Sequence, residues 1–197
     1  MDKRADRGQA TRDLLVTVAT GLFAERGFDG TSIEAVLDAA GVSRGSLYHH
    51  FANKEALFDA VLDAVETRIG EDVLTAAASV DLSDPAAALR VGCLTWIRLA
   101  GDPVVQRIVL IDAPAVLGWE RWRAIEEQNA LGSLKAAMQA LAEAGRVRPE
   151  LADALAHTVL ASVNELALMI ARSDDQAATQ RTAELAVDEL LTRLVGA

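Results

Sequence analysis

Two short stretches of helical period, joined by a tight glycine turn, constrain this chain more than any other feature of its sequence. The first spans residues 31–40 and carries an apolar stripe behind Ser32, a good N-cap residue. A glycine ends it, and Ser43 can cap a second short helix. In this second helix Leu47 and Phe51 share one face, so the polar residues between them point elsewhere. The sequence therefore predicts two short helices connected by a turn.

Longer helical stripes flank this pair. Apolar residues recur at helical spacing from Thr11 to Arg26 and stop at Gly27, which we expect to end that helix. Asn53 can cap a longer helix, which we expect to link the two halves of the chain. Strand-forming residues are sparse and aromatic residues make up only 4% of the chain, so we expect an all-α protein of about nine helices.

Later helix boundaries are also marked in the sequence. Asp84 and Asp102 each precede a proline, which places a good N-cap before the first helical position. Further helices are expected at residues 119–144, at residues 150–172 and after residue 175, with a break at residues 113–115. No linker marks a domain boundary, so motif placement alone divides the chain into residues 1–65 and 66–197.

The distribution of charge limits where nucleic acid could bind. The formal net charge is −10, which disfavours a polyanion as partner. However, Lys3, Arg4, Arg7 and Arg12 give the N-terminus a local basic excess, so any DNA-binding surface must be N-terminal. The first three could form an arm over phosphates or the minor groove, although short charged termini are often merely disordered.

Several classes of protein are disfavoured. The single cysteine, Cys93, excludes an intrachain disulfide and fits a reducing compartment. The N-terminus lacks the apolar stretch of a secretory signal, and no run of about 18 apolar residues occurs, so we expect a cytoplasmic protein without a membrane partner. His49 and His50 are adjacent and His157 is distant, so we expect no metal site. Catalytic and phosphate-loop motifs are missing from the sequence, so we expect neither an enzyme nor a cofactor.

The segment from Gly27 to Leu62 resembles the DNA-binding domain of the TetR family of transcriptional regulators nearly throughout its length. The most telling pieces are the turn at residues 39–43, the helix at residues 45–51 and the helix start at residues 53–57. The resemblance implies a three-helix domain with a helix-turn-helix, followed by a helical ligand-binding and dimerisation domain. Residues 110–122 also look like a segment that recurs in a subset of such regulators.

The polar side of the second short helix is the expected DNA-reading surface. Arg44 lies in its first turn, and a guanidinium can bond guanine O6 and N7 together, so we expect it to read bases. Gly45 is either a close approach of the backbone to DNA, which the resemblance favours, or a weak helix position. The resemblance implies phosphate contacts for Tyr48 and Lys54, whose phenolic O–H and ammonium suit an acceptor oxygen.

The remaining expected DNA contacts are Thr31, Ser32, Ser43, Ser46, His49 and His50. Alternatives stay open for some of them. Simple capping explains Ser32 without DNA, and His50 suits packing as well as phosphate contact. Glu34 departs from the family pattern, because many relatives have a basic or neutral residue near this helix start. A carboxylate close to phosphates would repel them. We expect it to face solvent or to pair with an arginine.

The C-terminal part is less informative. Apolar and aromatic residues there could line a small-molecule pocket, although core packing explains them equally well; they are Cys93, Trp96, Ile97, Trp119, Trp122 and Met138. The last two helices are expected to supply half of an intersubunit four-helix bundle. Its expected interface residues are Leu155, Val159, Ser162, Leu166, Leu190 and Leu194.

Together these features predict a repressor that binds a palindromic operator in double-stranded DNA as a homodimer and is released by a small molecule of unknown identity. The competing hypothesis is a helical interaction protein that has this fold but does not bind DNA specifically. The net charge of −10 and Glu34 favour that alternative, whereas Arg44, Tyr48 and Lys54 argue against it.

Overall fold

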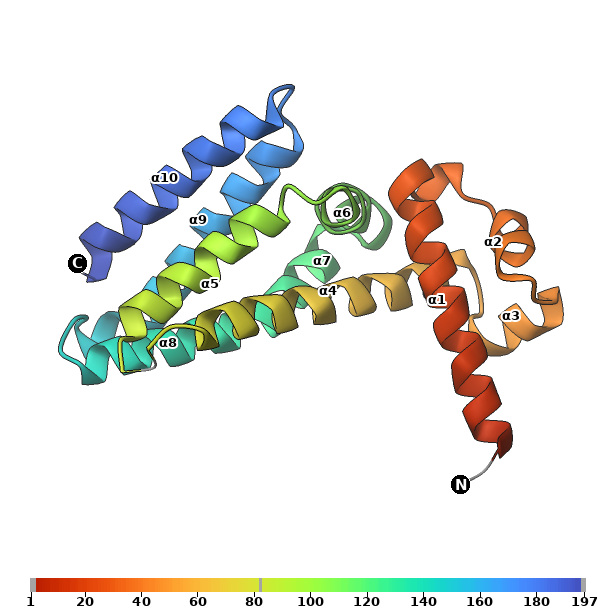
Figure 1. Cartoon of the computed structure of the whole chain (residues 1–197), viewed down its shortest axis with the longest axis horizontal. Helices are drawn as coiled ribbons and strands as arrows, with labels where there is room; N and C mark the ends of the chain where they lie inside the picture. Colours follow the sequence, from red (N-terminus) through yellow and green to blue (C-terminus); the bar gives the residue numbers. More distant parts are fainter. Residues whose placement is uncertain (1–2, 82, 196–197) are drawn as a thin grey trace.

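The structure is a computed structural model that describes residues 3–81 and 83–195. Within these ranges the regular structure is helical throughout and contains no strand, which confirms the expected all-α class. Figure 1 shows a small N-terminal head at one end of a long helix and a larger helical body along the rest of that helix.

The head contains α1 (Lys3–Gly30), α2 (Ile33–Ala40), α3 (Arg44–His50) and the first turns of α4 (Lys54–Ala78). Helix α1 begins earlier than the apolar stripe indicated, at Lys3 instead of Thr11. Gly27, which was expected to end the helix, has a φ of 73° and kinks the chain, and helical turns continue to Gly30. The N-caps predicted at Ser32, Ser43 and Asn53 are all present.

The body is formed by the rest of α4 and the following helices. They are α5 (Pro85–Leu99), the π-helix η1 (Val105–Asp112), α6 (Ala113–Leu117), α7 (Trp119–Glu126), the π-helix η2 (Glu127–Leu131), α8 (Gly132–Glu143), the 3-10 turn η3 (Pro149–Leu151), α9 (Ala152–Ala171) and α10 (Gln176–Val195). Figure 1 shows α9 and α10 as a pair at the edge of the body, beside α5.

Two of the expected boundaries in the body are confirmed and one is wrong. Asp84 accepts hydrogen bonds from the backbone N–H groups of Ala86 and Ala87, and Asp102 caps the next helix in the same way. The expected break at residues 113–115 is helical, however. The chain breaks instead at Gly118, whose φ of 80° and ψ of 154° no helix allows. Pro114 is tolerated because it lies in the first turn of α6, where a backbone N–H is dispensable.

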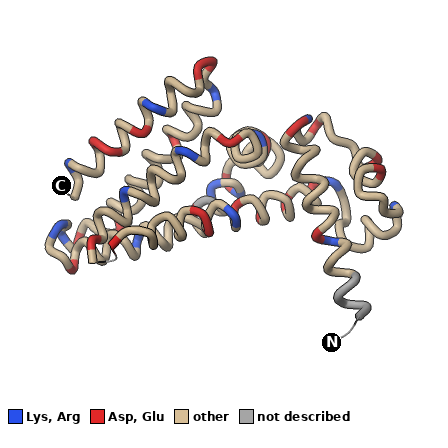
Figure 2. The backbone as a smooth tube through the Cα atoms, viewed as in Figure 1, with Lys and Arg blue, Asp and Glu red and all other residues tan. Residues whose placement is uncertain are grey.

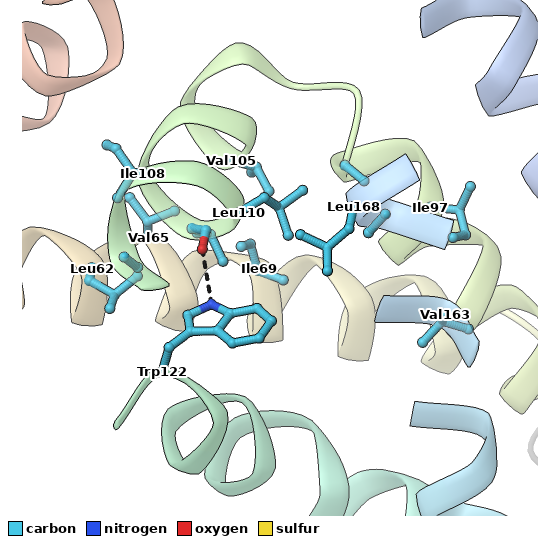
Figure 3. Packing of buried hydrophobic residues seen from close by; sticks show 14 of the residues in the cluster. Leu62, Val65, Ile69, Ile97, Val105, Ile108, Leu110, Trp122, Val163 and Leu168 are labelled. Carbon is cyan, nitrogen blue, oxygen red and sulfur yellow. Dashed lines mark hydrogen bonds between the residues drawn. The ribbon is translucent and has the colours of Figure 1, made fainter. Parts of the chain in front are cut away.

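One contiguous apolar cluster runs from α1 to α10. In its middle, Trp122 is 1% exposed, and its indole N–H donates to the carbonyl of Val109 across 2.9 Å (Figure 3). The same view shows Leu62, Val65 and Ile69 of α4 facing residues of η1, so α4 is the common wall of the body core.

Helix α9 is the most apolar helix of the body. With η3 it forms the segment Pro149–Ala171, which is long enough to span a membrane and contains an 18-residue stretch of mean hydropathy 1.5. It packs against α5, α8 and α10, and Val159, Val163 and Ala167 are buried there. The apolar sequence of α9 is therefore that of a core helix, because it packs against three other helices.

Candidate nucleic-acid interface and ligand cavity

Helices α2 and α3 each begin at a serine whose hydroxyl caps the first turn. The hydroxyl of Ser32 accepts from the N–H of Ala35 across 3.1 Å, and that of Ser43 accepts from the N–H of Ser46 across 3.2 Å. Gly41 lies between the helices with a φ of 65°. The left-handed region is costly for residues with a Cβ, so glycine is the residue that permits this turn.

The inner side of α3 is anchored and its outer side is free. Leu47 and Phe51 are buried in the head core. Arg44, Gly45 and His49 are exposed on the other side, and the ring of Tyr48 projects from the surface with 45% of its area accessible. Ser46 and His50 are half-buried. Of the residues expected to face DNA, Arg44, Gly45, Tyr48 and His49 therefore lie on the exposed side of α3.

Arg44 is paired with Glu34 of α2, as one of the two expectations for Glu34 proposed. Hydrogen bonds from its own backbone and from Arg44 hold the pKa of Glu34 below its ordinary value. The same contact raises the pKa of Arg44. Both side chains are more than half exposed, and exposed ion pairs contribute little to stability, so a base edge or a phosphate can replace Glu34 as the partner.

Lys54 begins α4 beside α3. Its Nζ lies 4.1 Å from the centre of the Phe28 ring, which packs against Phe23 and Phe58. A cation over an aromatic face is held in place by the ring quadrupole. The ammonium group is thus positioned at a helix N-terminus, where the backbone also favours an anion. Figure 2 shows Lys and Arg positions interspersed with Asp and Glu positions along the backbone of the head.

Thr31 does not belong to this surface. It is 1% exposed, and its hydroxyl donates to the carbonyl of Gly27 across 2.9 Å and lies 3.1 Å from that of Leu22. The expectation that Thr31 contacts phosphate is therefore wrong, because its hydroxyl is buried and bonds to carbonyl groups at the end of α1. The expected N-terminal arm of Lys3, Arg4 and Arg7 has its side chains outside the described residues.

A polar joint connects the head to the body. The carboxylate of Asp112, in η1, accepts the N–H of Phe28 across 2.7 Å and Nε of Arg107 across 3.2 Å. The residue is 6% exposed. The Arg107 guanidinium covers Gly27, and a Cβ at that position would clash with it. The kink of α1 and the π-helix η1 therefore meet at this contact between the head and the body.

A cavity of about 230 Å³ lies in the body between α4, α5, α8 and α9. Of the residues expected to line a pocket, Cys93 and Trp96 line this cavity. Ile97, Trp122 and Met138 are fully buried core residues that do not line it, and Trp119 is 59% exposed. The pocket expectation is therefore wrong for these four.

Sequence reasoning missed four polar residues of the cavity, which are Glu66, Asn129, Ser133 and Asn164. A signal for Glu66 existed. It lies four residues after Leu62 and three before Ile69, on the apolar stripe of α4, where a carboxylate is unexpected. Asn164 lies in the same way among the buried residues of α9.

A second hollow, of about 350 Å³, lies between the head and α7. Arg12, Asp59 and Arg121 line it, and Arg121 approaches Asp59 within 3.9 Å. Because charges of both signs line this groove, it suits water and ions better than an apolar molecule.

The expected dimer surface is partly available. Leu155, Ser162, Leu166, Leu190 and Leu194 retain exposed area on α9 and α10. Val159 is 0% exposed and packs inside the protomer, so it cannot present its side chain to a partner. Leu185 of α10 and Met169 of α9 are also exposed, by 72% and 51%.

Comparison with family models matches two parts of the chain. Residues 15–61 match the bacterial regulatory proteins of the tetR family, and residues 86–194 match a tetracyclin repressor-like C-terminal domain. The transcriptional repressor KstR2 of Mycobacterium tuberculosis is 44% identical over 62 residues, which cover 32% of this chain and 31% of that protein. The chain thus matches about a third of the length of this curated relative.

Comparison with solved structures covers nearly the whole chain. A TetR-family transcriptional regulator from Pectobacterium atrosepticum is 30% identical, with a TM-score of 0.86 and 98% of each chain covered. AibR, solved in complex with isovaleryl coenzyme A and operator DNA, is 23% identical with a TM-score of 0.64, and 94% of this chain and 98% of AibR are covered. The second likeness is one of fold.

Proposed function

Because the chain belongs to the TetR family of bacterial transcriptional regulators, we propose that it is a ligand-responsive repressor that binds operator DNA. The observation that carries this proposal is the outer face of α3. There Arg44 and Tyr48 are exposed on a helix whose other side is anchored, and Lys54 begins α4, the helix that follows. In a chain of net charge −10, this local arrangement fits phosphates and base edges.

The contacts divide by chemistry. Arg44 exchanges Glu34 for a base edge, preferably guanine, because its fork of donors matches O6 and N7. Tyr48, Lys54 and His49 bind phosphates and set the position of the helix. Gly45 allows the helix backbone to approach the DNA closely. Ser32, Ser43, Ser46 and His50 add contacts at the edges of this surface.

The DNA-bound form is a homodimer. Helices α9 and α10 with their counterparts in a second copy form a four-helix bundle around Leu155, Leu166, Leu190 and Leu194, with Ser162 at its edge. A twofold axis places two copies of α3 about 34 Å apart, one turn of the double helix, so the operator is a palindrome.

The cavity in the body is the effector site, and α4 connects it to the DNA-binding head. Lys54 and Glu66 lie on this one helix, twelve residues apart in the numbering, or about 18 Å along its axis. A ligand that prefers a different tilt of α4 changes the spacing of the two heads and releases the DNA. The fold neighbour AibR was solved with both a small molecule and operator DNA, which is consistent with this arrangement.

We place the boundary between the two units near residue 65, within α4, and the site of action on chromosomal DNA in the cytoplasm.

The test is selection of genomic fragments by the purified protein at moderate salt, followed by sequencing of the retained DNA. Enrichment of a palindrome with half-sites one helical turn apart supports the proposal, and its loss in Arg44→Ala would assign base reading to α3. Failure of a folded dimer to enrich any sequence would contradict it. That outcome would favour an interaction protein, in which the Glu34–Arg44 pair keeps the arginine occupied.

A further inference from the structure

The walls of the body cavity are mainly aliphatic. They are formed by Ile69 and Val73 of α4, Leu89 of α5, Leu134 of α8 and Leu160 and Val163 of α9. The Cys93 thiol also lines the cavity, and burial keeps it neutral by raising its pKa to about 12. A volume of about 230 Å³ with such walls suits a compact, largely apolar molecule.

One hydrogen-bond donor in this wall has no acceptor within the described part of the chain. The Nε1 of Trp96 is buried and makes no hydrogen bond there. Leaving a buried donor unsatisfied is unfavourable, so the occupant gains affinity by presenting an acceptor oxygen or nitrogen to it.

The electrostatic character of the cavity is set by one carboxylate. Glu66 is 6% exposed and accepts a hydrogen bond from Nδ2 of Asn129 across 3.4 Å. Among the described residues that line the cavity, Glu66 is the only Asp or Glu, and none is Lys, Arg or His. A carboxylate accepts several hydrogen bonds at once, and in an apolar surrounding it attracts a cation and repels an anion strongly.

We propose that the cavity binds a compact apolar amine, which presents its ammonium group to Glu66 and an acceptor atom to the indole N–H of Trp96. This rests on the proposed function for the cavity as effector site, but it concerns only what the cavity binds. Carboxylic acids and phosphorylated ligands are rejected because no basic side chain is present to compensate their charge.

Four probes of similar size separate the contributions of charge and acceptor: 3-(benzyloxy)propylamine, 3-(benzyloxy)propan-1-ol, 3-(benzyloxy)propanoate and 5-phenylpentylamine. Affinity is measured by calorimetry on the intact protein without DNA. We expect the ether amine to bind about tenfold or more tightly than the alcohol, and the propanoate more weakly still, because a hydrogen bond to a charged group is the strongest type available. Loss of the ether oxygen, in 5-phenylpentylamine, weakens binding by about threefold to tenfold.

Variants assign the two contacts. Glu66→Gln retains the shape of the side chain and should remove the preference of the site for the amine over the alcohol. Trp96→Phe should bring the ether amine down to the affinity of 5-phenylpentylamine. The control is Asp63→Asn, which removes an exposed carboxylate of α4 that does not line the cavity and should change nothing.

The wild-type probe series decides the question even if a variant fails to fold. Tighter binding of the propanoate than of the amine would overturn the proposal, and so would a complete lack of binding by all four probes. Amine binding without operator release would leave this inference intact and contradict the proposed regulation instead. Operator binding without binding of any probe would overturn this inference and leave the proposed DNA-binding function intact.

Discussion

Replacement of Asp112 by alanine is the most informative single perturbation of the joint between head and body. The carboxylate accepts the Phe28 N–H across 2.7 Å at a residue that is 6% exposed. Alanine leaves this partly buried N–H without its partner, which costs about 1–3 kcal/mol. The lost contact to Arg107 adds less, under about 1 kcal/mol, because that guanidinium is partly hydrated. We therefore expect the free energy of unfolding to fall by about 1–4 kcal/mol.

The assay is urea unfolding followed by circular dichroism, with hydrogen exchange at the Phe28 amide as a local readout. With a slope of about 2 kcal/mol per molar urea, the midpoint moves down by about 0.5–2 M while the slope stays constant. Asp112→Asn retains an acceptor for the Phe28 N–H and should recover part of the loss.

The matched control is Asp188→Ala. It removes an ion pair to Arg90 whose two side chains are 38% and 52% exposed, so little change in stability is expected. An equal midpoint shift in Asp112→Ala and Asp188→Ala would refute the reasoning, because it would mean that burial of the joint contributes nothing. Unchanged exchange at the Phe28 amide would do so independently.

Three further predictions concern the head and the cavity. Arg44→Ala should lower operator affinity about tenfold or more and relax base preference at one position. Lys54→Ala should weaken binding to all sequences alike and reduce the salt slope by about 0.9. Indistinguishable profiles of the two variants in a binding-site selection and a salt titration would contradict this division of roles. Gly41→Ala should destabilise the protein by about 1–2 kcal/mol in urea melts, because its φ is 65° while no atom lies within 4 Å of the added Cβ, so that the effect is backbone strain alone. Because burial raises the pKa of Cys93 from 9.0 to about 12, iodoacetamide near pH 8 should alkylate it slowly in the folded protein and rapidly in urea, and equal rates would be inconsistent with burial. The same shift lowers folding stability as pH rises from 9.0 to about 12, since the unfolded chain loses this proton first.

The sequence by itself determined the features that depend on near neighbours. The caps at Ser32, Ser43 and Asn53 accept from an N–H three residues later, so the residues that make each contact are adjacent in the chain. The apolar face of α3, with Leu47 and Phe51, follows from helical period alone. For the same reason its exposed face, with Arg44 and Tyr48, was predictable.

Other features were decided only by the tertiary structure. Thr31 is a good helix-start residue by sequence, but its hydroxyl is taken by α1. Ile97, Trp122 and Met138 read as pocket or core equally well until the packing of α4, α5 and α8 left the cavity elsewhere. Asp112 and Phe28 are 84 residues apart, and Glu66 meets Asn129 across 63. Contacts of this kind depend on which helix faces meet, and helical period specifies the apolar face of each helix without specifying its partner.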